Sequence, residues 1–89
     1  MIKSYQLTYS GKVQGVGFRY TVKRIADKYL IVGWARNLPN GSVDVFVQGE
    51  QPALDSFLKG VDHYFQDNIK DKKMTEENPL QLNGFEIRY

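Results

Sequence analysis

The sequence predicts an α+β fold in which an antiparallel sheet carries two helices on one face. Three observations predict it. Apolar residues alternate with polar ones in several short stretches, they recur at helical spacing in two longer ones, and glycine or proline separates these stretches. The 89 residues are enough for one hydrophobic core and too few for two. We therefore expect residues 1–89 to form a single domain.

The first strand, loop and helix are clearly marked. Tyr5, Leu7 and Tyr9 alternate with polar residues, which is the period of a half-buried strand. A glycine-rich loop over residues 11–17 follows. Apolar residues then recur at helical spacing over residues 18–29, with charged residues mostly on the other side.

A hairpin is predicted next. Residues 32–38 and 43–47 are rich in β-formers and predict two strands. Asn40-Gly41 between them favours a two-residue type I′ turn, in which both residues take positive φ.

The second half predicts a helix and two more strands. We expect Gly49 to end the preceding strand and Pro52 to stand in the first turn of a helix, whose apolar stripe covers residues 54–61. A short edge strand is expected over residues 69–75, and a last strand over residues 85–89.

This element order is that of the split βαβ, ferredoxin-like sandwich, with both helices on one face of the sheet. A right-handed connection would place the first strand beside the strand of residues 32–38.

The composition excludes several kinds of site. Without cysteine there is no disulfide, thiolate zinc site or cysteine nucleophile, and the one histidine, His63, cannot make a metal site by itself. No apolar run approaches the ~20 residues of a membrane span, and no signal peptide is evident. We therefore expect a cytoplasmic protein without a bound metal.

Charge and glycine spacing single out the loop before the first helix. Residues 11–36 carry six basic residues and one acidic residue, which suggests an anionic ligand, although a solvated helix face has the same charge. Gly15 and Gly17 let backbone N–H groups point toward an anion, and a helix N-terminus adds free N–H groups. Arg19 adds a fork of donors that matches phosphate oxygens. A plain turn with a surface arginine fits the same spacing.

Two common nucleotide-binding motifs do not fit. The dinucleotide motif G-x-G-x-x-G would need glycine where Tyr20 stands. A P-loop would need Lys and Ser or Thr after Gly17, where Phe18 and Arg19 stand.

Two longer strings carry a family resemblance. Residues 11–19, GKVQGVGFR, resemble the signature of the acylphosphatase family, and residues 33–43, GWARNLPNGSV, resemble its second signature. Residues 85–89, FEIRY, resemble the last strand of that family. The family usually has Leu-Gly at the end of the first helix, where this chain has Tyr29-Leu30. We therefore expect a different or strained helix end there.

The resemblance implies hydrolysis of acyl phosphates to a carboxylate and inorganic phosphate, without a metal or cofactor. Arg19 matches the family's phosphate-binding arginine and Asn37 its catalytic asparagine. Backbone N–H groups of the loop would hold the phosphoryl oxygens. The phosphate-binding residues so implied are Gln14, Gly15, Val16, Gly17, Phe18 and Arg19.

The expected partners are a small-molecule acyl phosphate and, as a product-like ligand, inorganic phosphate or sulfate. We expect a monomer with no membrane partner. The alternative is a non-catalytic module of the same fold that binds phosphate or RNA, since RRM domains share this topology. Residues 44–49, DVFVQG, have one aromatic residue, an acid and no Arg/Lys-Gly start, so nucleic acid is not favoured.

Overall fold

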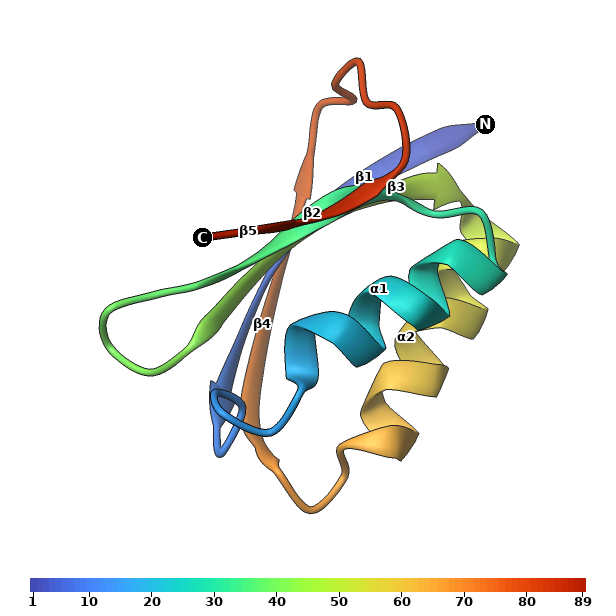
Figure 1. Ribbon diagram of the computed structural model, residues 1–89. Coiled ribbons are helices and arrows are strands. Elements are labelled where there is room, and N and C mark those ends of the chain that lie inside the picture. Colours follow the sequence, from blue (N-terminus) through green and yellow to red (C-terminus); the bar gives the residue numbers. More distant parts are fainter.

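The computed structural model describes residues 1–89 and has the predicted α+β fold. Its elements in chain order are β1 (Ile2–Gly11), α1 (Phe18–Lys28), β2 (Val32–Asn37), β3 (Val43–Glu50), α2 (Gln51–Tyr64), β4 (Ile69–Glu77) and β5 (Phe85–Arg88). Both helices cover the same face of the sheet (Figure 1). Neither helix is both long and apolar enough to cross a membrane.

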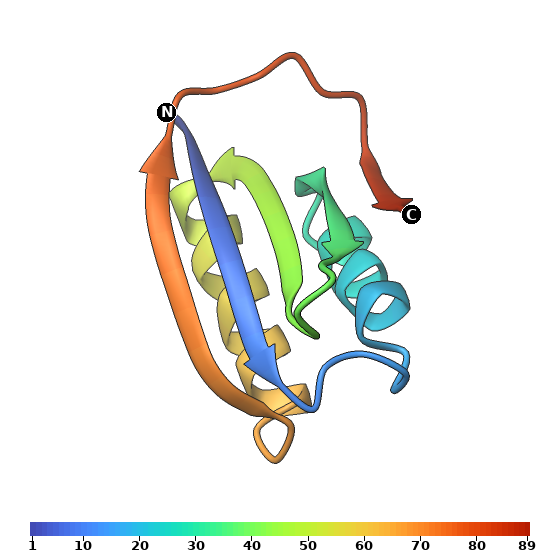
Figure 2. The same ribbon diagram turned by 90° about the vertical axis from the view of Figure 1, so that its left-hand side faces the viewer.

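The sheet has the order β4-β1-β3-β2-β5. All neighbours are antiparallel except β2 and β5, so the sheet is mixed rather than wholly antiparallel as predicted. The reason is the connection over residues 78–84. It leaves β4 at one edge, crosses the end of the sheet where β2 begins, and enters β5 at the other edge (Figure 2).

The prediction that β1 lies beside β2 was wrong, because β3 lies between them. Val43, Val45 and Val47 of β3 are completely buried under the helices, and Phe46 on the opposite face is only 3% exposed. A strand that is buried on both faces is most stable at the centre of a sheet. The hairpin therefore folds β3 back into the position beside β1.

The hairpin turn also differs from the prediction. Leu38 accepts a hydrogen bond from Gly41 N–H at 3.1 Å and donates one to the Ser42 carbonyl at 2.8 Å, so the loop has three residues. Among these three, Gly41 alone has positive φ, at 92°. Pro39 fixes a negative φ that suits the first position of a type I turn, and this turn followed by a left-handed glycine is the common three-residue hairpin.

Two strands are longer than predicted. β3 continues through Gly49, which pairs with Lys3, and ends at Glu50. A Cβ at Gly49 would lie 2.8 Å from Ile31 Cδ1, so a larger residue there would require the end of the Ile31 side chain to move. The edge strand β4 extends to Glu77 and pairs along most of β1. Pro52 lies at the start of α2, as predicted.

The end of α1 is strained, as the departure from the family pattern predicts. Leu30 has φ 57°, the one non-glycine residue of the chain with positive φ. It occupies the position that usually holds glycine in a Schellman motif: Leu30 N–H bonds the Asp27 carbonyl at 3.3 Å and Ile31 N–H bonds the Ala26 carbonyl at 2.8 Å. The Leu30 residue is 85% exposed, so its packing does not offset this strain.

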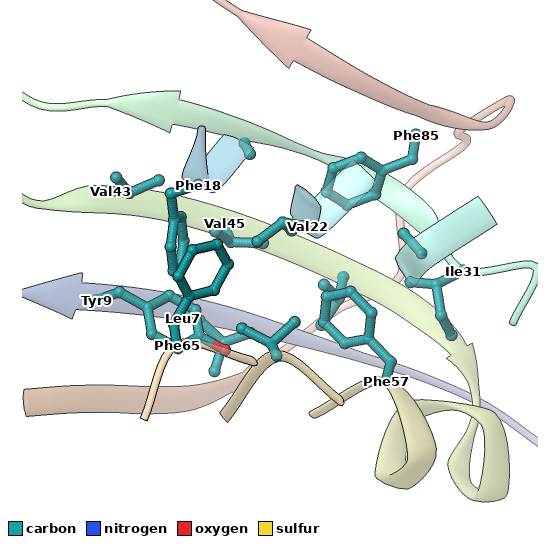
Figure 3. Packing of buried hydrophobic residues seen from close by; sticks show 14 of the residues in the cluster. Leu7, Tyr9, Phe18, Val22, Ile31, Val43, Val45, Phe57, Phe65 and Phe85 are labelled. Carbon is teal, nitrogen blue, oxygen red and sulfur yellow. The ribbon is translucent and has the colours of Figure 1, made fainter. Parts of the chain in front are cut away.

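The core lies between the sheet and the helices (Figure 3). Phe18, the first residue of α1, packs between two rings, with centroid distances of 5.1 Å to Tyr9 and 4.6 Å to Phe65. All three residues are buried. This aromatic contact fixes the N-terminus of α1 against the end of β1, and so fixes the loop between them.

Candidate active site

β1 and β2 finish at the same end of the sheet. Both strands run antiparallel to β3, so they point in the same direction, and Tyr9 and Asn37 both pair with Val43. The chain therefore leaves β1 close to the end of β2. The β1–α1 loop (residues 12–17) and the β2–β3 hairpin both lie at this end of the sheet (Figure 2), where the Gln14 side chain hydrogen-bonds the hairpin.

The β1–α1 loop is held at both ends. Lys12 N–H donates to the Asn68 carbonyl at 2.8 Å, and Asn68 Nδ2 donates to the Lys12 carbonyl at 3.1 Å. At the other end, Thr21 N–H donates to the Gly17 carbonyl at 3.0 Å and starts α1. Gly15 and Gly17 have φ of 76° and 75°, the left-handed conformation that L side chains rarely adopt.

The N–H groups of residues 14–17 of the loop have no partner within the protein. Of the 12 backbone hydrogen bonds outside helices and strands, none is donated by Gln14, Gly15, Val16 or Gly17. The N-cap of α1 makes no side-chain hydrogen bond, and no acidic residue stands in the first turn. The positive end of the helix and a row of free donors therefore meet at one place, which favours a bound anion.

A hollow of about 200 Å³ lies beside this loop and the first turn of α1. Its lining residues are Val13, Gly15, Gly17, Phe18, Arg19, Tyr20 and Asn37. The structure thus brings together five of the predicted site residues. Val16 is turned outward and is 37% exposed, while the Gln14 side chain is directed to the hairpin, so neither lines the hollow. Sequence reasoning missed Val13 and Tyr20.

Arg19 is held by the end of the chain. Its Nη1 donates to the Arg88 carbonyl at 2.9 Å, and its guanidinium lies 4.8 Å from the centre of the Tyr89 ring. The Tyr89 hydroxyl is 3.1 Å from that of Tyr20, and this hydrogen bond raises the pKa of Tyr89. Arg19 pairs with no carboxylate. Its charge and its other N–H groups are therefore available to a ligand.

Asn37 supplies an unused acceptor. As the last residue of β2, two positions after the completely buried Ala35, it directs its side chain to the helix-covered face. Its Oδ1 is buried and has no hydrogen-bond partner within the protein. Buried polar atoms are rarely left in this state. The other such atom, the Tyr9 hydroxyl, lies in the core, whereas Asn37 lines the hollow.

Comparison with known proteins decides the family. The acylphosphatase family model matches residues 5–87, almost the whole chain. The chain belongs to the acylphosphatase family. An acylphosphatase from Methanospirillum hungatei is 41% identical over 89 residues, covering 98% of each chain, and one from Bacillus licheniformis is 38% identical, covering 92% of this chain and 90% of its own.

The solved acylphosphatases share the fold as well. The crystal structure of the Bacillus subtilis acylphosphatase superposes with a TM-score of 0.87 at 35% identity, and each chain is covered completely. The family resemblance seen in the sequence signatures is thereby confirmed. Acylphosphatases are hydrolases of acyl phosphates, so this chain is an enzyme of that class.

Proposed function

We propose that this acylphosphatase cleaves acyl phosphates in the hollow between the β1–α1 loop and Asn37. One observation carries the proposal: three kinds of unused group face the same small space. They are the free N–H groups of the loop, a guanidinium with no carboxylate partner, and the buried Oδ1 of Asn37. The first two suit a phosphoryl group, and the third suits a water molecule.

The phosphoryl oxygens would be held by main-chain donors and by Arg19. Backbone N–H groups from Gln14 to Phe18 are free to bind one anion, and the first turn of α1 adds its partial positive charge. The Arg19 guanidinium adds parallel N–H donors that match phosphate geometry. Phosphoryl transfer depends mostly on positioning and on charge stabilisation, and these groups supply both.

Asn37 would orient the attacking water. Its Oδ1 accepts a hydrogen bond from the water, so that the oxygen lone pair faces phosphorus on the side opposite the carboxylate. The water oxygen bonds to phosphorus, the bond from phosphorus to the acyl oxygen breaks, and a carboxylate leaves. A carboxylate is a good leaving group, so no side-chain acid is required.

The proton of the water would pass to a phosphoryl oxygen of the substrate, because a carboxamide is not a base near neutral pH. His63, on the last turn of α2, does not line the hollow. We therefore expect kcat to survive replacement of His63. A sharp loss of kcat in His63→Ala would contradict this step.

The test is hydrolysis of benzoyl phosphate with EDTA present, which also tests the predicted independence of metal. Arg19→Ala and Asn37→Ala should each lower kcat/KM by about 10²–10³-fold, the usual cost of one preorganised group. Arg24→Ala on the exposed side of α1 and Asn83→Ala in the β4–β5 connection are the matched controls. Saturable phosphate binding without turnover would instead indicate the non-catalytic module.

The remaining expectations concern the setting of the enzyme. We propose that residues 1–89 act as one acylphosphatase domain that takes inorganic phosphate or sulfate as a product-like ligand. A cytoplasmic location and a monomeric state stay predictions of the sequence. Gel filtration with light scattering measures the second directly.

A further inference from the structure

We infer that the Gln14 side chain is a positioning residue, which holds the phosphate-binding loop at a fixed distance from Asn37. The inference rests on the proposed function and adds to it a side chain that touches no substrate atom. The sequence predicted a role only for the Gln14 main chain. In the structure its side chain is directed away from the hollow, to the β2–β3 hairpin.

Two hydrogen bonds carry the inference. Gln14 Nε2 donates to the Leu38 carbonyl and to the Ser42 carbonyl, both at 2.8 Å. No other hydrogen bond joins the β1–α1 loop to the hairpin. Gln14 is partly buried there, so water competes weakly for the two carbonyls.

The hairpin that receives these bonds is itself well held. Leu38 N–H donates to the Ser42 carbonyl at 2.8 Å, and the Ser42 N–H and hydroxyl donate to Asn40 Oδ1 at 3.1 and 2.5 Å. Ser42 is 4% exposed. Gln14 therefore binds a part of the hairpin that is itself fixed by several hydrogen bonds.

The two hydrogen bonds of Gln14 lie next to the residues proposed to hold the phosphate and the water. Leu38 follows Asn37 in the chain, and Gln14 is the residue before Gly15, which lines the hollow. The Asn37 side chain makes no hydrogen bond within the protein, so its position depends on the backbone around it. Joining Leu38 to Gln14 fixes the distance over which the water must reach phosphorus. A misplacement of about 1 Å at such a site can cost about 10²-fold in rate.

The experiment compares Gln14→Met with the wild type, using benzoyl phosphate as substrate and inorganic phosphate as competitive inhibitor. Methionine has similar length and no donor. We expect kcat to fall about 10²-fold, while the inhibition constant of phosphate changes less than about 3-fold, because Arg19 and the loop N–H groups remain. Gln66→Met, an exposed glutamine without a side-chain hydrogen bond, is the control and should match the wild type.

A double-mutant cycle shows whether Gln14 acts through Asn37. In the Asn37→Ala background, Gln14→Met should lower kcat by less than about 3-fold, because the group it positions is gone. Full additivity would overturn the inference, as would wild-type kcat in the single variant. If Gln14→Met does not fold, Gln14→Leu, which removes both donors and adds no charge beside the phosphate, replaces it. Loss of phosphate binding together with kcat would mean that the side chain merely supports the fold.

The same measurements distinguish failure of the proposed function from failure of this inference. If Asn37→Ala keeps wild-type kcat, Asn37 does not orient the water, and the proposed mechanism fails together with this inference. If Asn37→Ala loses activity while Gln14→Met does not, the mechanism stands and only the inference is wrong.

Discussion

Leu30→Gly should stabilise this protein. The left-handed conformation costs an L-residue roughly 1–2 kcal/mol, and Leu30 adopts it with φ 57°. Glycine removes that strain but makes the unfolded chain more flexible, which costs about 0.4–1 kcal/mol. Little packing is lost, since Leu30 is 85% exposed. The expected net gain is about 0.5–1 kcal/mol, a rise of roughly 2–8 °C in Tm for a domain of this size.

Thermal and urea unfolding followed by circular dichroism measure this gain. Leu30→Ala is the control, because alanine shortens the side chain but keeps the Cβ that causes the strain. It should not raise Tm. An unchanged or lower Tm in Leu30→Gly, or an equal rise in both variants, would refute the reasoning. Activity should be unaffected, because Leu30 does not line the hollow.

Three further predictions concern the site and the core. Arg19→Lys keeps the charge but loses the planar fork, so kcat/KM for benzoyl phosphate should fall by about 10²-fold; an active variant would mean that a point charge suffices. Inorganic phosphate should raise the Tm of the wild type in scanning calorimetry and leave that of Arg19→Ala unchanged, because only a folded, intact site binds it. Tyr9→Phe removes a buried hydroxyl without a partner and should raise the free energy of unfolding by about 1 kcal/mol. Burial, with a smaller effect of Asp62, raises the pKa of Tyr9 above its ordinary value of about 10. The folded protein therefore loses stability as the pH rises above that value, because Tyr9 ionises in the unfolded chain and not in the folded one. Urea unfolding should therefore show a steeper alkaline loss in the wild type than in Tyr9→Phe; equal slopes would contradict this.

Local patterns predicted the elements of the fold well, and pairing less well. The hydrophobic periods of strands and helices involve residues that are close in the sequence, so the elements can be predicted from the sequence directly. That β3 occupies the centre depends on Phe46, which is buried on the open face, and this becomes visible only when the strands are assembled. The parallel pairing of β5 depends on the path of residues 78–84, a stretch without periodicity.

For the site, too, the sequence predicted what local motifs determine and missed contacts between distant residues. Arg19 and Asn37 stand within signature strings, so the family pattern could place them, and the structure brings them to one hollow. The contacts of Arg88 and Tyr89 with Arg19 and Tyr20 could not be found this way. They join residues about seventy positions apart in the chain, and they require β5 to lie beside β2.

The residues at the two helix N-termini explain why we propose an anion site at the start of α1 and not at the start of α2. Both α1 and α2 begin without a side-chain cap. α2 follows the acidic residue Glu50, whose carboxylate already pairs with the Met1 ammonium at 2.7 Å, and Pro52 removes one of the free donors of its first turn. α1 follows Gly17, which has left-handed φ and ends a loop whose N–H groups at residues 14–17 have no partners, and Arg19 adds a positive charge with no acidic partner. A helix N-terminus is therefore not sufficient. The glycine turn and the free guanidinium together distinguish the site, and Asn37 turns an anion site into one that can hold a water beside the anion.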